Sequence, residues 1–106
     1  MARVFKRPAA LRDLVDQYVY LAENAGDAIA DRFLGCAEAS FQLLSTQPEM
    51  GVRILTRHAA LEGMRRWQVQ HFERHLIFYL PRPDGIAIIR VLHAQQDWWR
   101  ALGVIE

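Results

Sequence analysis

The sequence predicts an α+β fold in which an N-terminal helical hairpin packs on a small, mostly antiparallel sheet, in the order β-α-α-β-β-β-(α). Two observations indicate this class: the first half holds two long segments of helical periodicity, and the second half holds three strand-like segments. The chain has 106 residues, of which 52% are hydrophobic. This length and composition suit a single domain over residues 1–106 and exclude a disordered chain.

A brief strand and a helix are predicted at the N-terminus. Residues 3–6 (RVFK) are β-prone and are followed by Pro8, which suits the first turn of a helix over residues 8–25. Apolar positions with helical spacing form one face of this helix: Leu11, Leu14, Val15, Tyr18, Leu21 and Ala22. Charged positions, Asp13 among them, are assigned mainly to the other side.

A second helix is predicted over residues 27–47. Gly26 suits the end of the first helix, Asp27 suits the N-cap of the second, and Pro48 follows its last turn. A loop this short forces the two helices to fold back on each other as an antiparallel hairpin.

Three strands are predicted after an irregular connection over residues 51–63. They cover residues 64–70, 75–81 and 86–93. The Pro-Asp-Gly sequence within residues 81–85 suits the turn of a hairpin between the last two strands. The middle strand is apolar on both faces, so we expect the sheet to be covered on both sides.

The last predicted element is a short helix capped near Gln96 or Asp97. Trp98 and Trp99 are adjacent, so on a helix they point about 100° apart. We therefore expect one tryptophan to cap the core and the other to be exposed. Eight side chains are expected to be largely buried: Leu14, Tyr18, Phe33, Phe41, Trp67, Leu76, Phe78 and Ile88.

Basic residues are concentrated in the second half. Residues 53–93 hold seven arginines, three acidic residues and all four histidines, although the net charge of the chain is only +1. Lys6 is the only lysine among 13 basic residues. This preference for arginine suits bidentate contacts with carboxylate or phosphate, and a solvated basic face with ordinary ion pairs is the alternative.

Arg90 lies within the apolar last strand. Strand alternation places it on one face with three aliphatic residues, Ile86, Ile88 and Leu92. A charge there needs an acid, a carbonyl or water. Asp97 is the nearest acid that follows in the sequence, so a structural Arg90–Asp97 pair and a functional arginine both remain open. His93 is likewise either a hydrogen-bonded strand-end residue or an acid–base group.

Several chemical classes lack their motifs. The sequence contains no G-x-G-x-x-G, P-loop, G-x-S-x-G or zinc motif, and its single cysteine, Cys36, belongs to an apolar helical pattern. His71 and His75 fall around a predicted turn, so we expect no metal and no cofactor. Without a membrane-length apolar run or a signal-peptide segment, we expect a cytoplasmic protein that does not contact the membrane.

Two long segments resemble the RelE/ParE superfamily of type II toxins. GMRRWQVQHFERHLIFYLPRPDGIAIIRVLHAQQD, residues 63–97, is similar to the second half of these toxins, which carries "LIFY", a turn and "I-x-R-V-L-H". Residues 7–34 resemble their helical hairpin, and residues 47–51 (QPEMG) the turn that follows. The resemblance implies a β-α-α-β-β-β toxin, neutralised by a cognate ParD-like antitoxin that wraps the sheet and helices.

The two branches of that superfamily imply different activities. ParE-like toxins inhibit DNA gyrase by binding it, whereas RelE-like toxins cleave ribosome-bound mRNA with basic residues and a tyrosine or histidine. Here no tyrosine follows Tyr79, and the terminal aromatic residues are tryptophans, which cannot exchange protons. These departures favour the ParE-like branch. A degenerate member that binds an antitoxin without being toxic is a third reading.

Six residues are candidates for contact with the target or the antitoxin: Arg65, Arg66, Arg90, His93, Trp98 and Trp99. In the RelE-like alternative, Arg65 and Arg90 stabilise phosphate charge while His93 donates or accepts a proton.

Overall fold

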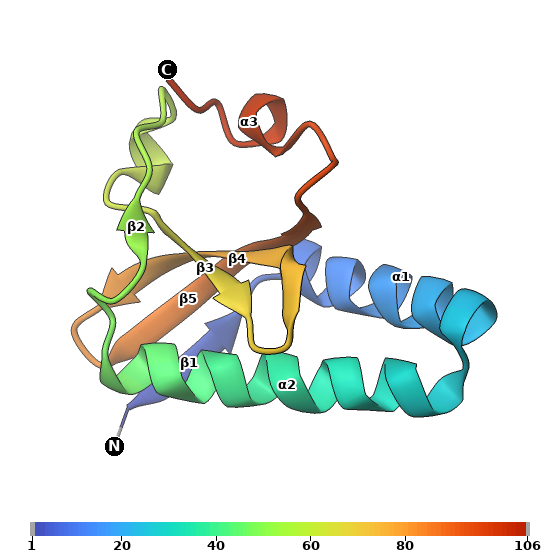
Figure 1. The fold of residues 1–106 in the computed structure, drawn as a ribbon. Coiled ribbons are helices and arrows are strands. Elements are labelled where there is room, and N and C mark those ends of the chain that lie inside the picture. The colour runs from blue at the N-terminus through green and yellow to red at the C-terminus, as the bar shows by residue number, and fades with distance from the viewer. Residues whose placement is uncertain (1, 106) are drawn as a thin grey trace.

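Two long helices pack on a five-stranded mixed sheet in the computed structural model of the protein, which describes residues 2–105 (Figure 1). In chain order the elements are β1 (Arg3–Lys6), α1 (Pro8–Ala25), α2 (Asp27–Thr46), β2 (Val52–Arg53), a 3-10 turn (Ala59–Leu61), β3 (Arg65–Val69), β4 (Phe72–Arg82), β5 (Gly85–His93) and α3 (Trp98–Ala101). The predicted α+β class and the predicted order of helices and strands are confirmed.

The sheet has the strand order β1-β5-β4-β3-β2. β1 pairs with β5 in parallel, and all other neighbours are antiparallel. β4 begins at Phe72, earlier than predicted, and forms a long hairpin with β5. The short strand β2 lies inside the segment that was predicted to be irregular. Its two residues are both exposed, so no burial pattern in the sequence could indicate it, and pairing with β3 alone defines it.

The helical hairpin has the predicted boundaries to within one residue. Gly26 joins the helices with a φ of 96°, and its N–H donates to Ala22 O at 3.2 Å. The predicted buried face of α1 is wrong in part. Leu11 and Val15 are 48% and 61% exposed, whereas Asp13 is buried. The reason is that α1 lies against β5 as well as α2, so its buried side includes polar positions.

Apolar clusters cover both faces of the sheet, as the two-sided strand pattern predicted. The helix-side cluster joins residues of α1 and α2 to the sheet: Ala10, Leu14, Phe33, Ala37, Phe41, Leu44, Val69, Ile77, Tyr79, Ile86, Ile88 and Val91. The second cluster lies under α3 and the chain's C-terminal segment: Met64, Leu76, Phe78, Leu80, Ala87, Ile89, Leu92 and Leu102. In Figure 1 the sheet separates α2 from α3.

Six of the eight predicted core residues are buried, and the exceptions are Tyr18 and Trp67. Both are half-buried, and Trp67 packs against the helix-side cluster. The Tyr18 hydroxyl donates to Asp31 Oδ1 at 2.7 Å across the helical hairpin. A tyrosine can bury its ring while its hydroxyl stays near water, which periodicity alone does not distinguish from full burial.

A β-bulge overturns the predicted faces of the last strand. The register moves from Phe78 opposite Arg90 to Tyr79 opposite Ile88, so Ile89 is an extra residue in β5. One extra residue reverses the alternation beyond it. As a result, Val91 joins the helix-side cluster and Leu92 the second cluster.

The C-terminal segment pairs with the connection between β2 and β3. Arg57 N donates to Gly103 O and Ile105 N donates to Leu55 O, both at 2.8 Å. Thr56 and Val104 form an antiparallel bridge between these hydrogen bonds. This pairing holds α3 over the second cluster. Within residues 2–105, no helix has the length and hydropathy needed to cross a membrane.

Candidate functional site

Arg90 forms a two-bond pair with Asp13 on α1. Its Nε donates to Asp13 Oδ2 at 2.7 Å and its terminal NH2 donates to Oδ1 at 2.9 Å. Asp13 Oδ2 also accepts the N–H of Val91 at 3.0 Å. The hydrogen bond with Asp13 raises the pKa of Arg90, so the guanidinium stays charged. Arg90 is therefore held as a structural ion pair.

The expected Arg90–Asp97 pair does not form. Asp97 Oδ2 instead lies 4.0 Å from Arg100 NH1, in an exposed contact. The physical reason is topological: β1 covers β5 only as far as Ile88, so the next residues of β5 face α1 directly. Asp13 is distant in the sequence but adjacent in the fold.

Gln17 extends the same contact by one helical turn. Its amide nitrogen donates to Val91 O, and its amide oxygen accepts a hydrogen bond from His75 Nδ1. Asp13 and Gln17 thus satisfy both peptide groups of Val91, as a neighbouring strand would. An uncovered sheet edge is a site of unwanted pairing, and these two side chains close it.

His75 and His93 stand opposite each other at the end of the sheet. They are register partners on β4 and β5, and their ring centroids are 5.2 Å apart. Burial lowers the pKa of His75 to about 4, with a further contribution from the charge of His93. His75 also packs against Phe33, at 4.7 Å between ring centroids. At neutral pH it is an uncharged residue of the core margin.

Arg65 braces the turn that leads into β2. Its NH1 donates to the carbonyl oxygens of Gly51 at 2.7 Å and Glu49 at 3.1 Å. Tyr79, its partner on β4, donates to Pro48 O at 2.8 Å and accepts the N–H of Gly51 at 2.9 Å. Arg65 therefore has a structural role: it stabilises the turn before β2 on the helix side of the sheet.

Arg66 points to the other face of the sheet and meets the tryptophans. Its guanidinium carbon lies 5.5 Å from the ring centroid of Trp98. Trp98 packs on Phe78 with centroids 5.3 Å apart, and Trp99 lies 5.6 Å from Trp98. Trp98 is half-buried and Trp99 is 40% exposed. One tryptophan therefore caps the core while the other faces solvent, as the spacing predicted.

The six predicted site residues do not form one cluster in the described contacts. Arg66, Trp98 and Trp99 come together. Arg65 and His93, however, lie opposite Tyr79 and His75, toward opposite ends of β4. Of the three candidate catalytic residues of the RelE-like alternative, Arg65 and His93 therefore lie apart, and Arg90 is bound to Asp13.

Sequence reasoning missed two groups of residues. Asp13 was assigned to the side of α1 opposite its apolar face and Gln17 was not singled out, although their spacing of four places them on one side of α1 beside Ala10 and Leu14. The other group lines a pocket between α3 and the β2–β3 connection: Arg57, His58, Trp99, Arg100, Gly103 and Val104. No local pattern relates residues 57–58 to residues 99–104.

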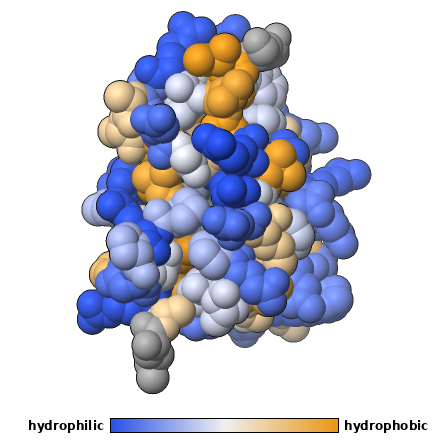
Figure 2. Space-filling view, turned by 90° about the vertical axis from the view of Figure 1, so that its left-hand side faces the viewer, coloured by the Kyte–Doolittle hydropathy of each residue, from blue (hydrophilic) through white to orange (hydrophobic). Residues whose placement is uncertain are grey.

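Three exposed aliphatic side chains follow one side of α1. Leu11, Val15 and Val19 have the spacing i, i+4 and i+8 and are 48%, 61% and 46% exposed. We call these residues the α1 stripe. On the side of the molecule that carries β2, apolar areas are interspersed among hydrophilic residues (Figure 2).

Metal ligands and cysteines are the last residue types to consider among residues 2–105. Among these residues, no group of three or more histidine, cysteine, aspartate or glutamate side chains is placed to hold a metal ion. Cys36 is half-buried in α2 and forms no disulfide. The helical hairpin, the bulged β-hairpin and the short terminal helix over the opposite face agree with the β-α-α-β-β-β architecture that the resemblance to the RelE/ParE superfamily implies.

Comparisons with known proteins identify the family. Residues 4–98 match the family model described as the ParE toxin of the type II toxin–antitoxin system, parDE. The chain belongs to this family. A solved structure described as the "Chromosomal ParDE TA system from P. aeruginosa" has the same fold, with a TM-score of 0.70 and 15% sequence identity. The match covers 88% of this chain and 96% of that one. No curated protein sequence gives a significant match.

Proposed function

We propose that the protein is a toxin that a ParD-like antitoxin neutralises in a hetero-oligomer, and that it inhibits DNA gyrase by binding rather than by catalysis. Membership of the ParE toxin family over residues 4–98 supports the first part. The Asp13–Arg90 pair is the main support for binding rather than catalysis. Arg90 already binds Asp13, whereas mRNA cleavage would require this arginine to stabilise a phosphate.

Two further contacts support binding over catalysis. Arg65 directs a guanidinium nitrogen at two carbonyl oxygens of its own chain, so phosphate would have to displace those bonds. His93 faces a buried neutral histidine instead of a carboxylate that could orient it. An endonuclease needs charge stabilisation and proton transfer at one reacting phosphate, and these residues point to separate places.

The α1 stripe is the surface that we assign to the antitoxin. An apolar helical segment that folds on binding can cover Leu11, Val15 and Val19 in a helix-against-helix contact. Nearby charges then orient the partner: Arg12 and Asp16 are both exposed on this helix. Apolar anchors dominate the affinity of such a contact, whereas charges mainly change its association rate.

The aromatic surface on the opposite face is assigned to the target. Arg66, Trp98 and Trp99 combine an arginine, a packed ring and an exposed ring, which is the composition of protein-binding hot spots. In this assignment Arg65 and Arg90 have structural roles: Arg65 holds the turn before β2, and Arg90 pairs with Asp13. His93 lines a separate pocket with Asp16 and Gln17 of α1.

A paired assay tests this proposal. The purified protein is added to a DNA gyrase supercoiling reaction and, in parallel, to a translation reaction in which mRNA cleavage is read by primer extension. Loss of supercoiling with intact mRNA supports the proposal. Cleaved mRNA with intact supercoiling establishes the endonuclease alternative, and inactivity in both assays establishes a degenerate member.

The variant His93→Gln distinguishes a gyrase-binding toxin from an endonuclease, because glutamine keeps hydrogen bonding but does not titrate near neutral pH. An endonuclease that uses His93 as acid or base loses about 100-fold or more in rate. A gyrase-binding toxin keeps most of its inhibition. His71→Asn is the matched control, since His71 is exposed and has a φ of 65°, which asparagine tolerates.

A further inference from the structure

A pocket lies where α1 passes the end of the β4–β5 hairpin that carries the two histidines. Asp16, Gln17 and Tyr20 line it from α1, and His75 and His93 line it from the strands. We call it the histidine pocket. Its volume of about 460 Å³ is within the range of ligand-binding pockets.

Hydrogen bonds within the protein occupy one nitrogen of each imidazole. His75 Nδ1 donates to Gln17 Oε1, and His93 Nδ1 accepts the N–H of Gln95 at 3.1 Å. His75 Nε2 has no hydrogen-bond partner among residues 2–105, whereas every fully buried side-chain nitrogen or oxygen there has one. This nitrogen is therefore reachable from outside, through the pocket that His75 lines.

His75 presents that nitrogen as a hydrogen-bond acceptor. Burial lowers the pKa of His75 to about 4, so the ring is neutral at pH 7. A neutral imidazole that donates through Nδ1 carries a lone pair on Nε2. The ring of His93 stands at 84° to that of His75 and closes the pocket beside it.

Asp16 gives the histidine pocket a negative charge. It takes part in none of the ion pairs between described residues, and no arginine or lysine is among the residues that line the pocket. Arg90 is close along the sheet, but Asp13 already neutralises it. A cation that enters the pocket therefore meets an unpaired carboxylate and no fixed positive charge.

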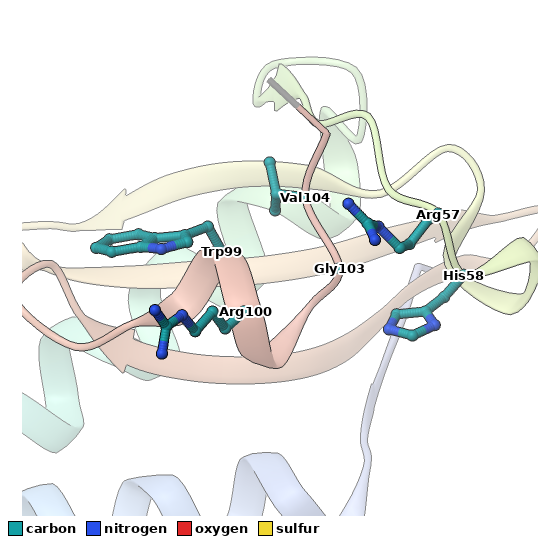
Figure 3. Close-up of a pocket in the computed structure, with 6 residues that line it drawn as sticks. All are labelled: Arg57, His58, Trp99, Arg100, Gly103 and Val104. Atoms are coloured by element: carbon teal, nitrogen blue, oxygen red, sulfur yellow. The ribbon is translucent and has the colours of Figure 1, made fainter.

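The pocket between α3 and the β2–β3 connection has the opposite character. Arg57 and Arg100 line it, and none of its lining residues is acidic. Figure 3 shows that Arg100 extends beside Trp99 and away from Arg57. A cation is repelled by these arginines, so it favours the histidine pocket.

Tyr20 and Leu21 add a ring and an aliphatic wall. Tyr20 is 65% exposed and lies four residues after Asp16, so its ring and the carboxylate are neighbours on α1. Leu21 is half-buried and also lines the pocket. A guanidinium stacks on aromatic faces, and its aliphatic stem packs on apolar side chains.

The histidine pocket opens beside the α1 stripe. Asp16 and Tyr20 directly follow Val15 and Val19, and each step along a helix turns by about 100°. A partner segment that covers the stripe therefore passes the mouth of the pocket.

We propose that the histidine pocket receives an arginine side chain of the antitoxin. Its guanidinium pairs with Asp16 and stacks on Tyr20, and a remaining N–H donates toward the acceptor nitrogen of His75. Arginine suits this site better than lysine because its planar group offers five donors and a stacking face, whereas an ammonium is a compact point charge. The assignment rests on the proposed contact between the antitoxin and the α1 stripe.

Kinetics of the antitoxin complex test the assignment. The full-length protein is immobilised, and the cognate antitoxin is passed over it in surface plasmon resonance. Asp16→Asn should raise the dissociation constant at least about 10-fold, mainly through faster dissociation, because a charge pair seated in a pocket acts on the dissociation rate. Tyr20→Leu should raise it at least about 3-fold. Circular dichroism establishes that each variant is folded.

Glu23→Gln is the matched control. Glu23 is an exposed acid on the same helix and lies outside the pocket, so this variant should change the dissociation constant less than about 3-fold. An equal loss in Asp16→Asn and Glu23→Gln would overturn the assignment, because it would indicate general attraction to acidic residues. Slower association of Asp16→Asn with unchanged dissociation would also overturn it, since Asp16 would then be a charge at the rim of the interface.

A double-mutant cycle identifies the occupant. Each arginine and lysine of the antitoxin is changed singly to glutamine and measured against both the unaltered protein and Asp16→Asn. One arginine should weaken binding to the unaltered protein at least about 10-fold and cause little further loss in Asp16→Asn. Coupling to a lysine instead, or to no basic residue, would contradict the proposed guanidinium.

Failure of this assignment can be told apart from failure of the proposed function. If the unaltered protein does not bind the antitoxin, both are wrong. If it binds, and Val15→Lys weakens the complex while Asp16→Asn does not, the α1 stripe remains the interface and only the pocket assignment is wrong. Tighter binding by Asp16→Asn would show that the occupant is acidic or apolar.

Discussion

Asp13 on α1 and Arg90 on β5 are 77 residues apart in the chain and share two hydrogen bonds, at 2.7 and 2.9 Å. The same carboxylate accepts the N–H of Val91. One acidic side chain therefore neutralises an arginine and closes the sheet edge where β1 ends. This contact joins the first helix to the last strand.

Removing the carboxylate at position 13 should destabilise the fold. Asp13→Asn leaves a partly buried guanidinium without its counter-ion, and we expect the free energy of unfolding to fall by about 2–3 kcal/mol. Urea denaturation followed by circular dichroism measures this change. Asp97→Asn is the control, with an expected change below about 0.5 kcal/mol. A larger loss for Asp97→Asn than for Asp13→Asn would contradict the observed pairing.

The stability of the protein should depend on pH through His75. Its pKa is about 4 when folded and 6.5 as the ordinary value, so the unfolded state binds more protons between these limits. Stability is therefore complete above pH 6.5 and falls as the pH drops toward 4. With partial screening by solvent, we expect a loss of about 1–2 kcal/mol.

Denaturant titrations at several pH values between 4 and 7 measure this loss. His75→Gln removes the titrating group, so its curve should be flatter than that of the unaltered protein. His71→Asn is the control and should retain the slope, because His71 is exposed. Equal slopes for the unaltered protein and His75→Gln would show that another group controls the acid sensitivity.

The two tryptophans should separate stability from binding. Trp98 packs on Phe78 and under Arg66, so Trp98→Ala should lower the free energy of unfolding by about 2–3 kcal/mol. Trp99→Ala should cost less than about 1 kcal/mol in stability because its ring is 40% exposed. The double variant should weaken binding to the target or the antitoxin by at least about 2 kcal/mol. Calorimetric titration of the folded variants measures both affinities; unchanged values would restrict the tryptophans to packing.

A charge on the α1 stripe should weaken the antitoxin complex without unfolding the toxin. Val15 is 61% exposed, so Val15→Lys leaves the core intact while it places a charge in the proposed contact. We expect the dissociation constant to rise at least about 10-fold, through faster dissociation, in surface plasmon resonance with the cognate antitoxin. Val52→Lys is matched in exposure, at 57%, and lies on β2. A similar effect of both substitutions would place the interface elsewhere.

The local features of the fold were predictable because their causes are local. Pro8, Gly26 and Pro48 bound the two helices, and the turn within residues 81–85 joins the two longest strands. Even the division of Trp98 and Trp99 into a packed and an exposed ring follows from their adjacency on a helix. Each of these predictions depends on residues a few positions apart.

The candidate site was less predictable because it depends on distant segments. The faces of β5 predicted from strand alternation were wrong beyond Ile89, because a bulge there reverses them. No residue type in this segment indicates a bulge. The sequence also favoured Asp97 as the partner of Arg90, because a sequence shows how far apart two residues are along the chain but not how far apart they are in space.

By itself, the sequence determined the α+β class, the helical hairpin, six buried residues of the two apolar clusters and the likeness to the RelE/ParE toxins, because periodicity and turn residues follow from neighbouring positions. Only the tertiary structure decided that Asp13 holds Arg90, that Gln17 joins Val91 to His75, and that Arg57 lines a pocket with Trp99. The physical reason is that a charge or a polar peptide group takes the partner that the fold brings within hydrogen-bonding distance. Chain topology sets that distance.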